Sequence, residues 1–119
     1  MKLPLFGQDL STEQTAFVSA FAQSCRASIL KMVTQVQSGH PGGSLSALDY
    51  LALLYAFRIT DTNERVVVSN GHISPAVYSV LAELDVIPKE RVLTQFRRPS
   101  DLYEGHVNRR IQGIHFGTG

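Results

Sequence analysis

Three of the four histidines in this chain directly follow a glycine, and the three Gly-His pairs divide the sequence into segments. They are Gly39-His40, Gly71-His72 and Gly105-His106, and each lies where a periodic segment ends or is about to begin. Glycine permits a positive φ and a close approach of the backbone to a ligand. Neutral imidazole donates or accepts a hydrogen bond and transfers protons near pH 7. The pairs are therefore candidate binding-site loops between regular elements.

The segment before the first pair predicts a long amphipathic helix. Ser11 and Gln14 have the spacing of a capping box, which marks a helix start. Apolar residues then recur every three or four positions, and the pattern ends at Ser38-Gly39. Residues 1–11 before it are expected to form an extended arm. Cys25 lies on the apolar face, where a buried structural thiol is expected.

A second helix is predicted from an apolar stretch after the first pair. The residues from His40 to Gly43 include a proline and two glycines, so we expect them to be non-helical. Ser46 and Asp49 then offer a second capping box, and the helix is expected to extend to Phe57. Because it is apolar on almost every side and a single strand is predicted to cover it, we expect exposed apolar surface and partner chains.

The remaining chain predicts one strand and two shorter helices. Residues 66–68 are consecutive valines, which favour a fully buried strand. Ser74-Pro75 places a capping residue before a proline at the first helical position, and a further short helix is expected over residues 88–96. Residues 100–119 are glycine-rich and irregular, with at most a short strand around Ile114.

Composition excludes several classes of protein. A hydrophobic fraction of 44% and a charged fraction of 18% are typical of a folded chain, and 119 residues suit one domain. Eleven basic and ten acidic residues leave a net charge of +1, which argues against nucleic acid as a partner. A single cysteine excludes an internal disulfide. With no secretory signal or membrane-spanning stretch recognised, we expect no membrane association and a cytoplasmic location.

The histidine spacing permits two other interpretations. The nearly even spacing resembles a helical repeat, but the intervening segments do not resemble each other, so we reject a repeat array. Three histidines are also compatible with zinc, but no His-x-His pair and no cysteine ligand accompanies them. We therefore name no metal ligand in this chain. His115, the fourth histidine, is expected to be a surface or packed residue.

The first two Gly-His loops have a chemistry that suits an anion. The string Gly-His-Pro-Gly-Gly at 39–43 leads toward a helix, whose free N–H groups and positive dipole end favour negative charge. The string Ser-Asn-Gly-His at 69–72 follows the predicted strand and leads into the helix that starts near Ser74. Sheets of α/β proteins bind ligands where strands end and helices begin. Two such loops together predict a diphosphate or sugar-phosphate site with imidazoles available for proton transfer.

Four strings in the same order resemble motifs of the transketolase family. Ser-Gly-His-Pro-Gly-Gly-Ser at 38–44 resembles the family's opening motif, and Arg-Val-Val-Val-Ser-Asn-Gly-His at 65–72 resembles the second. Phe-Arg-Arg at 96–98 followed by Gly105-His106 resembles the third. Gly-Thr-Gly at 117–119 resembles the start of the fourth, and the order and spacing agree throughout.

The resemblance extends from about Ala27 to the last residue and implies an α/β fold. Residues 1–119 are then the N-terminal portion of a thiamine-diphosphate-binding domain whose parallel sheet is completed by other segments or chains. The implied reaction transfers a two-carbon ketol unit between sugar phosphates, with thiamine diphosphate and Mg²⁺ as cofactors. The implied partners are a complementary transketolase subunit, or the remaining segments, in an oligomer that binds a sugar phosphate.

The roles of individual residues carry over from the family by motif. The resemblance implies that His72 contacts the diphosphate of the cofactor and that Gly119 lies beneath it, where a side chain would collide. His40 and His106 are implied to flank the substrate and to donate to its oxygens as charge develops. Val107-Asn108 follows the third pair where the family has a proline. No Gly-Asp-Gly string occurs, so the metal ligands are expected from outside this chain.

Two alternatives to a transketolase-like enzyme stay open at this point. One is a fragment of an enzyme like 1-deoxyxylulose-5-phosphate synthase, although the Ser-Gly-His-Pro and Ser-Asn-Gly-His strings favour transketolase. The other is a non-catalytic interaction module that kept the scaffold and lost the metal site. We expect the chain to be a natural split subunit, an experimental fragment or a decayed gene product, and to be inactive by itself.

Overall fold

In the computed structural model the regular structure is helical, as the helix-rich prediction requires. The structure describes residues 4–59, 63–99 and 101–118. Within these ranges no strand occurs, and no helix is both long and apolar enough to cross a membrane. The elements are the α-helices α1 (Thr12–Val36), α2 (Pro41–Leu53), α3 (Ser74–Glu83) and α4 (Lys89–Gln95), the π-helical turn η1 (Leu54–Ile59) that continues α2, and the 3₁₀ turn η2 (Gly71–Ile73) that precedes α3.

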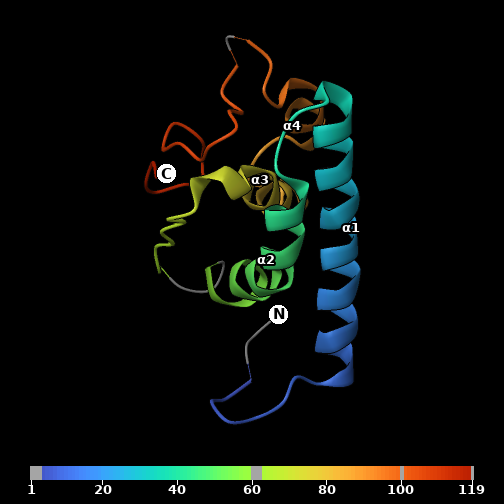
Figure 1. The fold of residues 1–119 in the computed structure, drawn as a ribbon. Coiled ribbons are helices and arrows are strands. Elements are labelled where there is room, and N and C mark those ends of the chain that lie inside the picture. Colours follow the sequence, from blue (N-terminus) through green and yellow to red (C-terminus); the bar gives the residue numbers. More distant parts are fainter. Residues whose placement is uncertain (1–3, 60–62, 100, 119) are drawn as a thin grey trace.

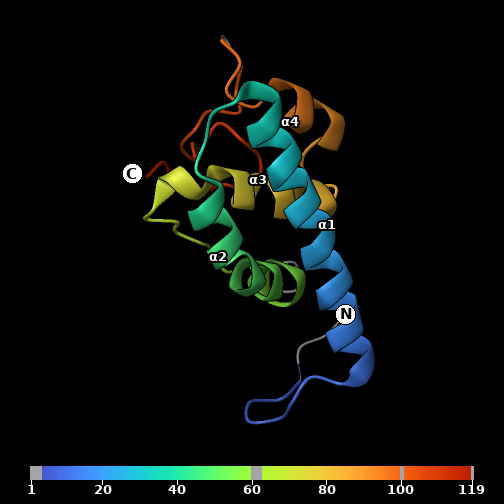
Figure 2. The same cartoon turned by 45° about the vertical axis from the view of Figure 1, so that its right-hand side comes forward.

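The helices pack around one apolar core. Figure 1 shows α1 along one side of the molecule, with α2, α3 and α4 beside it, and all three contact α1. The irregular C-terminal segment lies on the side of α3 away from α1, which Figure 2 shows from a second direction. The largest fully buried side chains of this core include Tyr78, Phe57, Phe96, Ile29 and Met32.

The first helix begins as predicted and ends at Val36, two residues before the predicted end at Ser38-Gly39. The N–H of Gln14 donates to Ser11 Oγ at 3.1 Å, and the N–H of Ser11 donates to Gln14 Oε1 at 2.8 Å, which completes the capping box. At the other end Gln37 adopts a left-handed conformation with a φ of 51°. Its N–H donates to the carbonyl oxygens of Thr34 and Val33 and so closes the last turn.

The second helix begins at Pro41 rather than near Ser46, so the prediction of a non-helical stretch there is wrong. Proline is tolerated in the first turn because the N–H that it lacks has no intrahelical partner at that position. Gly42 and Gly43 continue the same turn, and Leu48 anchors the helix in the core. Ser46 does not cap the helix, since its hydroxyl donates to the Gly43 carbonyl oxygen at 3.0 Å.

The apolar surface of α2 and η1 is covered more completely than predicted. Leu48 and Leu51 are buried, because both α1 and α3 pack against α2. Phe57 is also buried, and its ring meets that of Phe17 on α1 at a centroid distance of 6.4 Å. The expectation that much of this apolar surface is exposed in the isolated chain is therefore wrong for these residues. Tyr50 does remain 69% exposed.

Residues 66–68 do not form a strand in the described structure. Val68 is buried, but Val67 is 58% exposed, so the prediction of a fully buried strand is wrong. A strand needs a neighbouring strand to complete its backbone hydrogen bonds. Across the described ranges no other segment forms a ladder with these valines, which follow an irregular path instead.

The last two helices follow the predictions closely. Ser74 is the first residue of α3 and Pro75 the second, so the cap position is occupied by Ile73, one residue earlier than predicted. Proline again lies in the first turn, where it breaks no hydrogen bond. The short helix α4 is one residue shorter at each end than the predicted span of 88–96, because Pro88 and Phe96 occupy its cap positions.

Residues 101–118 are irregular, as predicted, and form a layer over α3. Ile114 is not part of a strand, although its side chain is buried. Val107 and Ile111 are buried in the same core, and Tyr103 joins them. This segment therefore packs on the helices and brings the third Gly-His pair toward α3.

Candidate functional site

Two of the three Gly-His pairs meet at the amino ends of helices. His40 occupies the cap position of α2, and His72 lies in η2, which leads directly into α3. The two ring centroids lie 5.4 Å apart with an interplanar angle of 74°, an edge-to-face arrangement. His40 is exposed and His72 is half-buried. The two imidazoles therefore lie next to each other, at the starts of α2 and α3.

The three glycines around His40 differ in the space that surrounds them. Gly39 has a φ of 134°, and a Cβ at this position would lie only 2.7 Å from Val33 Cγ1 of α1. A Cβ on Gly43 would lie 3.6 Å from His72 Nε2, at ordinary contact distance. Gly42 has nothing within 4 Å of its Cβ position. The turn after Gly39 is thus fixed against α1, while the first turn of α2 is open at Gly42.

Thr118, the last described residue, lies against Gly71 of the second Gly-His pair. A Cβ on Gly71 would lie 2.4 Å from the carbonyl oxygen of Thr118, a distance that side chains do not tolerate. The Thr118 hydroxyl donates to the carbonyl oxygen of Val68. Glycine at position 71 therefore allows Thr118 of the fourth motif to pack directly against the second motif. Gly119, the predicted cofactor contact within the fourth motif, lies outside the described residues.

The third Gly-His pair reaches the same region through its backbone. The N–H of Val107 donates to the Gly71 carbonyl oxygen at 3.1 Å. The carbonyl oxygen of His106 lies 3.1 Å from the Tyr78 hydroxyl of α3. The His106 side chain itself is exposed. These contacts bring the main chain of the third pair next to the second.

The groups around His40 and His72 fit an oxygen-rich anion such as a diphosphate. The first N–H groups of α2 have no intrahelical acceptor, and the positive end of the helix dipole lies beside them. The imidazoles add donors that an anion accepts. The Ser44 hydroxyl in the first turn of α2 is buried and has no hydrogen-bond partner within the described ranges. The turn is also open at Gly42, where nothing lies within 4 Å of the Cβ position.

The described residues do not build a metal centre by themselves. Within the described ranges no group of three or more His, Cys, Asp or Glu side chains is close enough together to hold a metal ion. His115 is exposed and lies in a different hollow, with Arg109 and Arg110. Cys25 is buried on α1, and burial raises the pKa of its thiol from 9.0 to about 12. The thiol is therefore protonated and unreactive at neutral pH, as a buried structural cysteine should be.

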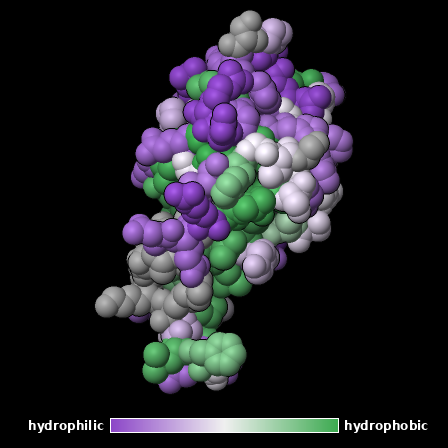
Figure 3. All heavy atoms as spheres, turned by 90° about the vertical axis from the view of Figure 1, so that its left-hand side faces the viewer, coloured by the Kyte–Doolittle hydropathy of each residue, from purple (hydrophilic) through white to green (hydrophobic). Residues whose placement is uncertain are grey.

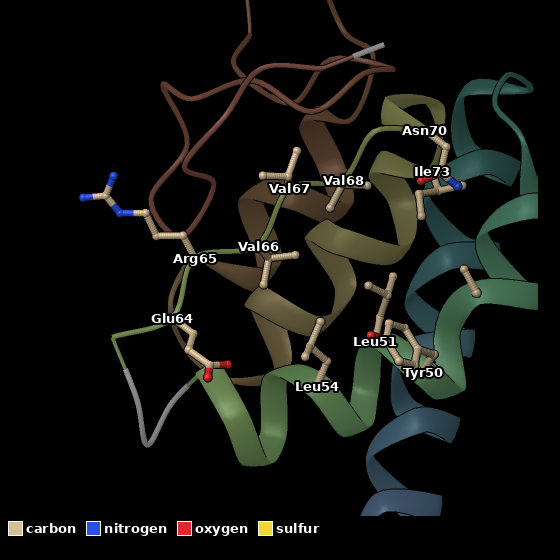
Figure 4. A pocket seen from close by; sticks show the side chains of 11 residues that line it. Tyr50, Leu51, Leu54, Glu64, Arg65, Val66, Val67, Val68, Asn70 and Ile73 are labelled. Carbon is tan, nitrogen blue, oxygen red and sulfur yellow. The ribbon is translucent and has the colours of Figure 1, made fainter.

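An apolar groove of about 460 Å³ lies beside this region rather than within it. Figure 4 shows Leu54 and Val66 on facing sides of the groove, while Arg65 points away from it. Asn70 and Ile73 line the end that is next to the second Gly-His pair. Figure 3 shows hydrophobic atoms gathered in the middle of the face on which the C-terminal segment lies. The groove is apolar, so the anion chemistry belongs to the helix ends and not to this hollow.

The sequence analysis does not predict the contacts of three residues in this region. Ser74 and Tyr78 hold the third Gly-His loop on α3, and Thr118 ties the chain end to Val68. A tyrosine one turn after a serine on an otherwise aliphatic helix is a usable signal, because a buried tyrosine hydroxyl needs a partner. No local pattern marks the Thr118 contact, because it joins residues 50 positions apart.

Comparisons with known proteins cover the region that carries the motifs. The family model described as "Transketolase, thiamine diphosphate binding domain" matches residues 18–119. The "6-deoxy-6-sulfo-D-fructose transketolase subunit SqwG" of Clostridium sp. (strain MSTE9) is 34% identical over 118 residues, which cover 91% of this chain and 42% of that protein. The transketolases of Mus musculus and Rattus norvegicus are each 33% identical over 93 residues, which cover 71% of this chain and 15% of those proteins. The chain thus spans less than half the length of these relatives.

Proposed function

Because the chain belongs to the transketolase family, we propose that it acts as part of a transferase that moves a two-carbon ketol unit between sugar phosphates. Residues 18–119 correspond to the thiamine-diphosphate-binding domain of this family. Since the relatives are more than twice as long, the reaction requires a complementary subunit or the remaining segments of the domain. The isolated chain is expected to be inactive.

The observation that carries this proposal is the contact between His40 and His72. Their rings lie 5.4 Å apart at the starts of α2 and α3. A packing histidine has no need of a partner imidazole, an open glycine turn and a helix amino end at the same place. A site for a diphosphate and a polyhydroxylated substrate can use all three.

His72 and Gly119 are proposed to serve the cofactor. Bound thiamine diphosphate supplies a stabilised carbanion, and the protein supplies its binding and orientation. His72 is half-buried between the first turn of α2 and the second Gly-His loop, so its ring is held in place to donate to a diphosphate oxygen. Gly119 follows Thr118, which lies against Gly71, and its place in the fourth motif supports the proposed role beside the diphosphate.

His40 and His106 are proposed to serve the substrate. Both side chains are exposed, which leaves their nitrogen atoms free to approach a sugar. As charge develops on the substrate oxygens, an imidazole within hydrogen-bond distance donates to them and exchanges protons near neutral pH. The neighbourhood of His40 to His72, and of the third loop to Gly71, supports a shared cavity for both ligands.

The rest of the enzyme is proposed to come from other segments or chains. Residues 1–119 form the N-terminal portion of the binding domain. Of the predicted extended arm, residues 1–3 lie outside the described residues, and residues 4–11 are irregular with a turn in which the Gln8 N–H donates to the Leu5 carbonyl oxygen. The parallel sheet of the α/β fold is completed beside residues 66–68, where Val67 and the apolar groove are exposed. The Mg²⁺ ligands lie outside this chain, and the assembly is a cytoplasmic oligomer. One relative is itself named a subunit, which supports a split organisation.

The two alternatives receive less support. The matching relatives are named transketolases or a transketolase subunit, which favours ketol transfer over the synthase reaction. A non-catalytic interaction module would not need His40 and His72 in contact at two helix starts. The cofactor test below separates this module from an enzyme part.

Cofactor binding tests the proposal. Thiamine diphosphate with Mg²⁺ is titrated calorimetrically into the chain alone and into the complex with the chains that co-purify with it. We expect binding in the complex and little or none in the chain alone, because the metal ligands are missing. Absence of binding in every complex would contradict the proposed function and favour an interaction module. The same complex is then assayed for ketol transfer with phosphorylated and sulfonated sugars.

A further inference from the structure

Two hydroxyl groups of α3 form hydrogen bonds with the loop that contains the third Gly-His pair. The Tyr78 hydroxyl lies 2.9 Å from the Glu104 carbonyl oxygen and 3.1 Å from that of His106. The Ser74 hydroxyl, one helical turn earlier, donates to the Glu104 carbonyl oxygen at 3.2 Å. Both Ser74 and Tyr78 are fully buried. The loop is therefore bound to the helix on the two sides of Gly105.

The number of hydroxyl protons shows which of the two hydroxyl groups can donate to the His106 carbonyl oxygen. Each hydroxyl has one proton to donate, and the two carbonyl oxygens offer two acceptors. The Ser74 hydroxyl donates to Glu104, so the Tyr78 proton is the one available to His106. Burial raises the pKa of the Tyr78 hydroxyl above its ordinary value, so this donor stays protonated at any working pH. The position of the His106 main chain thus depends on the hydrogen bond from Tyr78.

The ring of Tyr78 is itself fixed. It meets the ring of Phe96 at 6.2 Å and that of Tyr103 at 5.6 Å, both edge-to-face. On the far side of His106, the Val107 N–H donates to the Gly71 carbonyl oxygen at 3.1 Å. The segment from Gly71 through α3 therefore contains His72 near its start. The same segment binds the loop of His106 through hydrogen bonds of Gly71 and Tyr78. A shift of the loop would change the position of His106 relative to His72.

From this geometry we propose that Tyr78 is a positioning residue, which fixes the main chain of His106 so that its imidazole faces the same cavity as His72. This inference rests on the proposed role of His106 at the substrate. It gives Tyr78 a part in turnover without contact with substrate or cofactor. Tyr78 acts through the loop, and its effect should vanish when the His106 imidazole is removed.

A double-mutant cycle in the catalytically competent complex tests this dependence. The variants are Tyr78→Phe, His106→Ala and the double variant, and Tyr103→Phe is the matched control. Tyr103→Phe removes a hydroxyl from the adjacent ring, and no hydrogen bond from that hydroxyl to the loop is present among the described residues. We expect Tyr78→Phe to lower kcat about tenfold, the scale of one lost hydrogen bond, with KM and cofactor affinity nearly unchanged. In the His106→Ala background we expect no further loss.

Hydrogen exchange gives a readout that is independent of activity. The Val107 amide, which donates to Gly71, should exchange several-fold faster in Tyr78→Phe than in the parent complex or in Tyr103→Phe. If Tyr78→Phe fails to fold, Ser74→Ala replaces it in the exchange measurement. A smaller acceleration at Val107 is then expected, because the Glu104 oxygen competes with that of His106 for the Tyr78 proton. Unchanged exchange in the variant that folds would overturn the proposal.

The outcomes separate this inference from the proposed function. If His106→Ala slows turnover but Tyr78→Phe does not, or if the two effects multiply, the positioning role is wrong and the proposed function stands. If His106→Ala leaves turnover unchanged while the complex binds cofactor, both the substrate role of His106 and the positioning role of Tyr78 are wrong. If no complex binds cofactor, the proposed function itself has failed.

Discussion

The rings of His40 and His72 lie edge-to-face with their centroids 5.4 Å apart, although α2, η1 and the irregular segment after them separate the two residues in sequence. The contact joins the start of α2 to the start of α3. Gly43 of the same turn packs against His72, whose Nε2 lies 3.6 Å from the position of a Cβ on Gly43. The two helix starts and the two imidazoles therefore form a single structural unit.

Substitution of the two histidines should separate cofactor binding from turnover. We expect His72→Ala to weaken thiamine diphosphate binding by roughly 10- to 100-fold, the range for a lost hydrogen bond to a charged group. His40→Ala should lower kcat about 100-fold with a smaller change in cofactor affinity. Calorimetry and steady-state kinetics on the complex measure the two effects.

His115→Ala is the matched control for this pair of variants. Its side chain is exposed and lies in the hollow beside Arg109 and Arg110, away from the contact between His40 and His72. It should leave both affinity and turnover unchanged. Unaltered cofactor affinity in His72→Ala would remove His72 from the diphosphate site.

Substitution of Gly71 should disturb the chain end more than the helix that follows. A Cβ at this position would lie 2.4 Å from the Thr118 carbonyl oxygen, so Gly71→Ala is expected to cost about 1–3 kcal/mol of unfolding free energy. Gly42→Ala is the comparison, because nothing lies within 4 Å of its Cβ position and alanine favours a helix. Gly42→Ala should leave stability unchanged or raise it. Denaturant unfolding measures both, and equal stabilities would show that Thr118 does not rest on Gly71.

The Ser44 hydroxyl should contribute nothing to the stability of the cofactor-free chain. It is buried in the first turn of α2 with no partner among the described residues, and such a group costs about 1–3 kcal/mol of solvation. Ser44→Ala is therefore expected to be neutral or stabilising. Ser74→Ala, which removes a hydroxyl bonded to Glu104, should be destabilising by about 1 kcal/mol. A Ser44→Ala variant that unfolds more readily than Ser74→Ala would mean that Ser44 has a partner.

Alkaline pH should destabilise the chain through Cys25. Burial raises the pKa of this thiol from 9.0 to about 12, so the unfolded thiol ionises first and the folded state holds the extra proton. Stability is then complete below pH 9 and falls as pH rises toward 12, by up to about 1.4 kcal/mol per pH unit for this group. Unfolding free energies measured from pH 8 to 10.5 give the slope. Cys25→Ala should have a smaller slope above pH 9, and an equal slope would contradict the assignment.

Local signals account for the parts of the fold that the sequence predicts well. The capping box of Ser11 and Gln14 lies within a single turn, and it marks the start of α1 correctly. The prolines before α4 and in the first turn of α3 act through their own backbone, so those helix starts are also close to the predictions. Such elements need no knowledge of the rest of the chain.

The errors arise where the tertiary environment outweighs the local preference. Pro41 and the two glycines after it favour a loop, yet packing of Leu48 and its neighbours on α1 and α3 extends α2 through them. Residues 66–68 have strand-forming side chains, but a strand exists only with a partner, and the described chain offers none. The contacts of Tyr78 and Thr118 with distant carbonyl oxygens leave no periodic trace in the sequence.

A structure of the complete complex with thiamine diphosphate and Mg²⁺ tests the shared cavity most directly. We predict a diphosphate oxygen within hydrogen-bond distance of the His72 ring, with the imidazoles of His40 and His106 facing the same cavity. A diphosphate bound elsewhere, with these three rings on unconnected surfaces, would contradict the proposal.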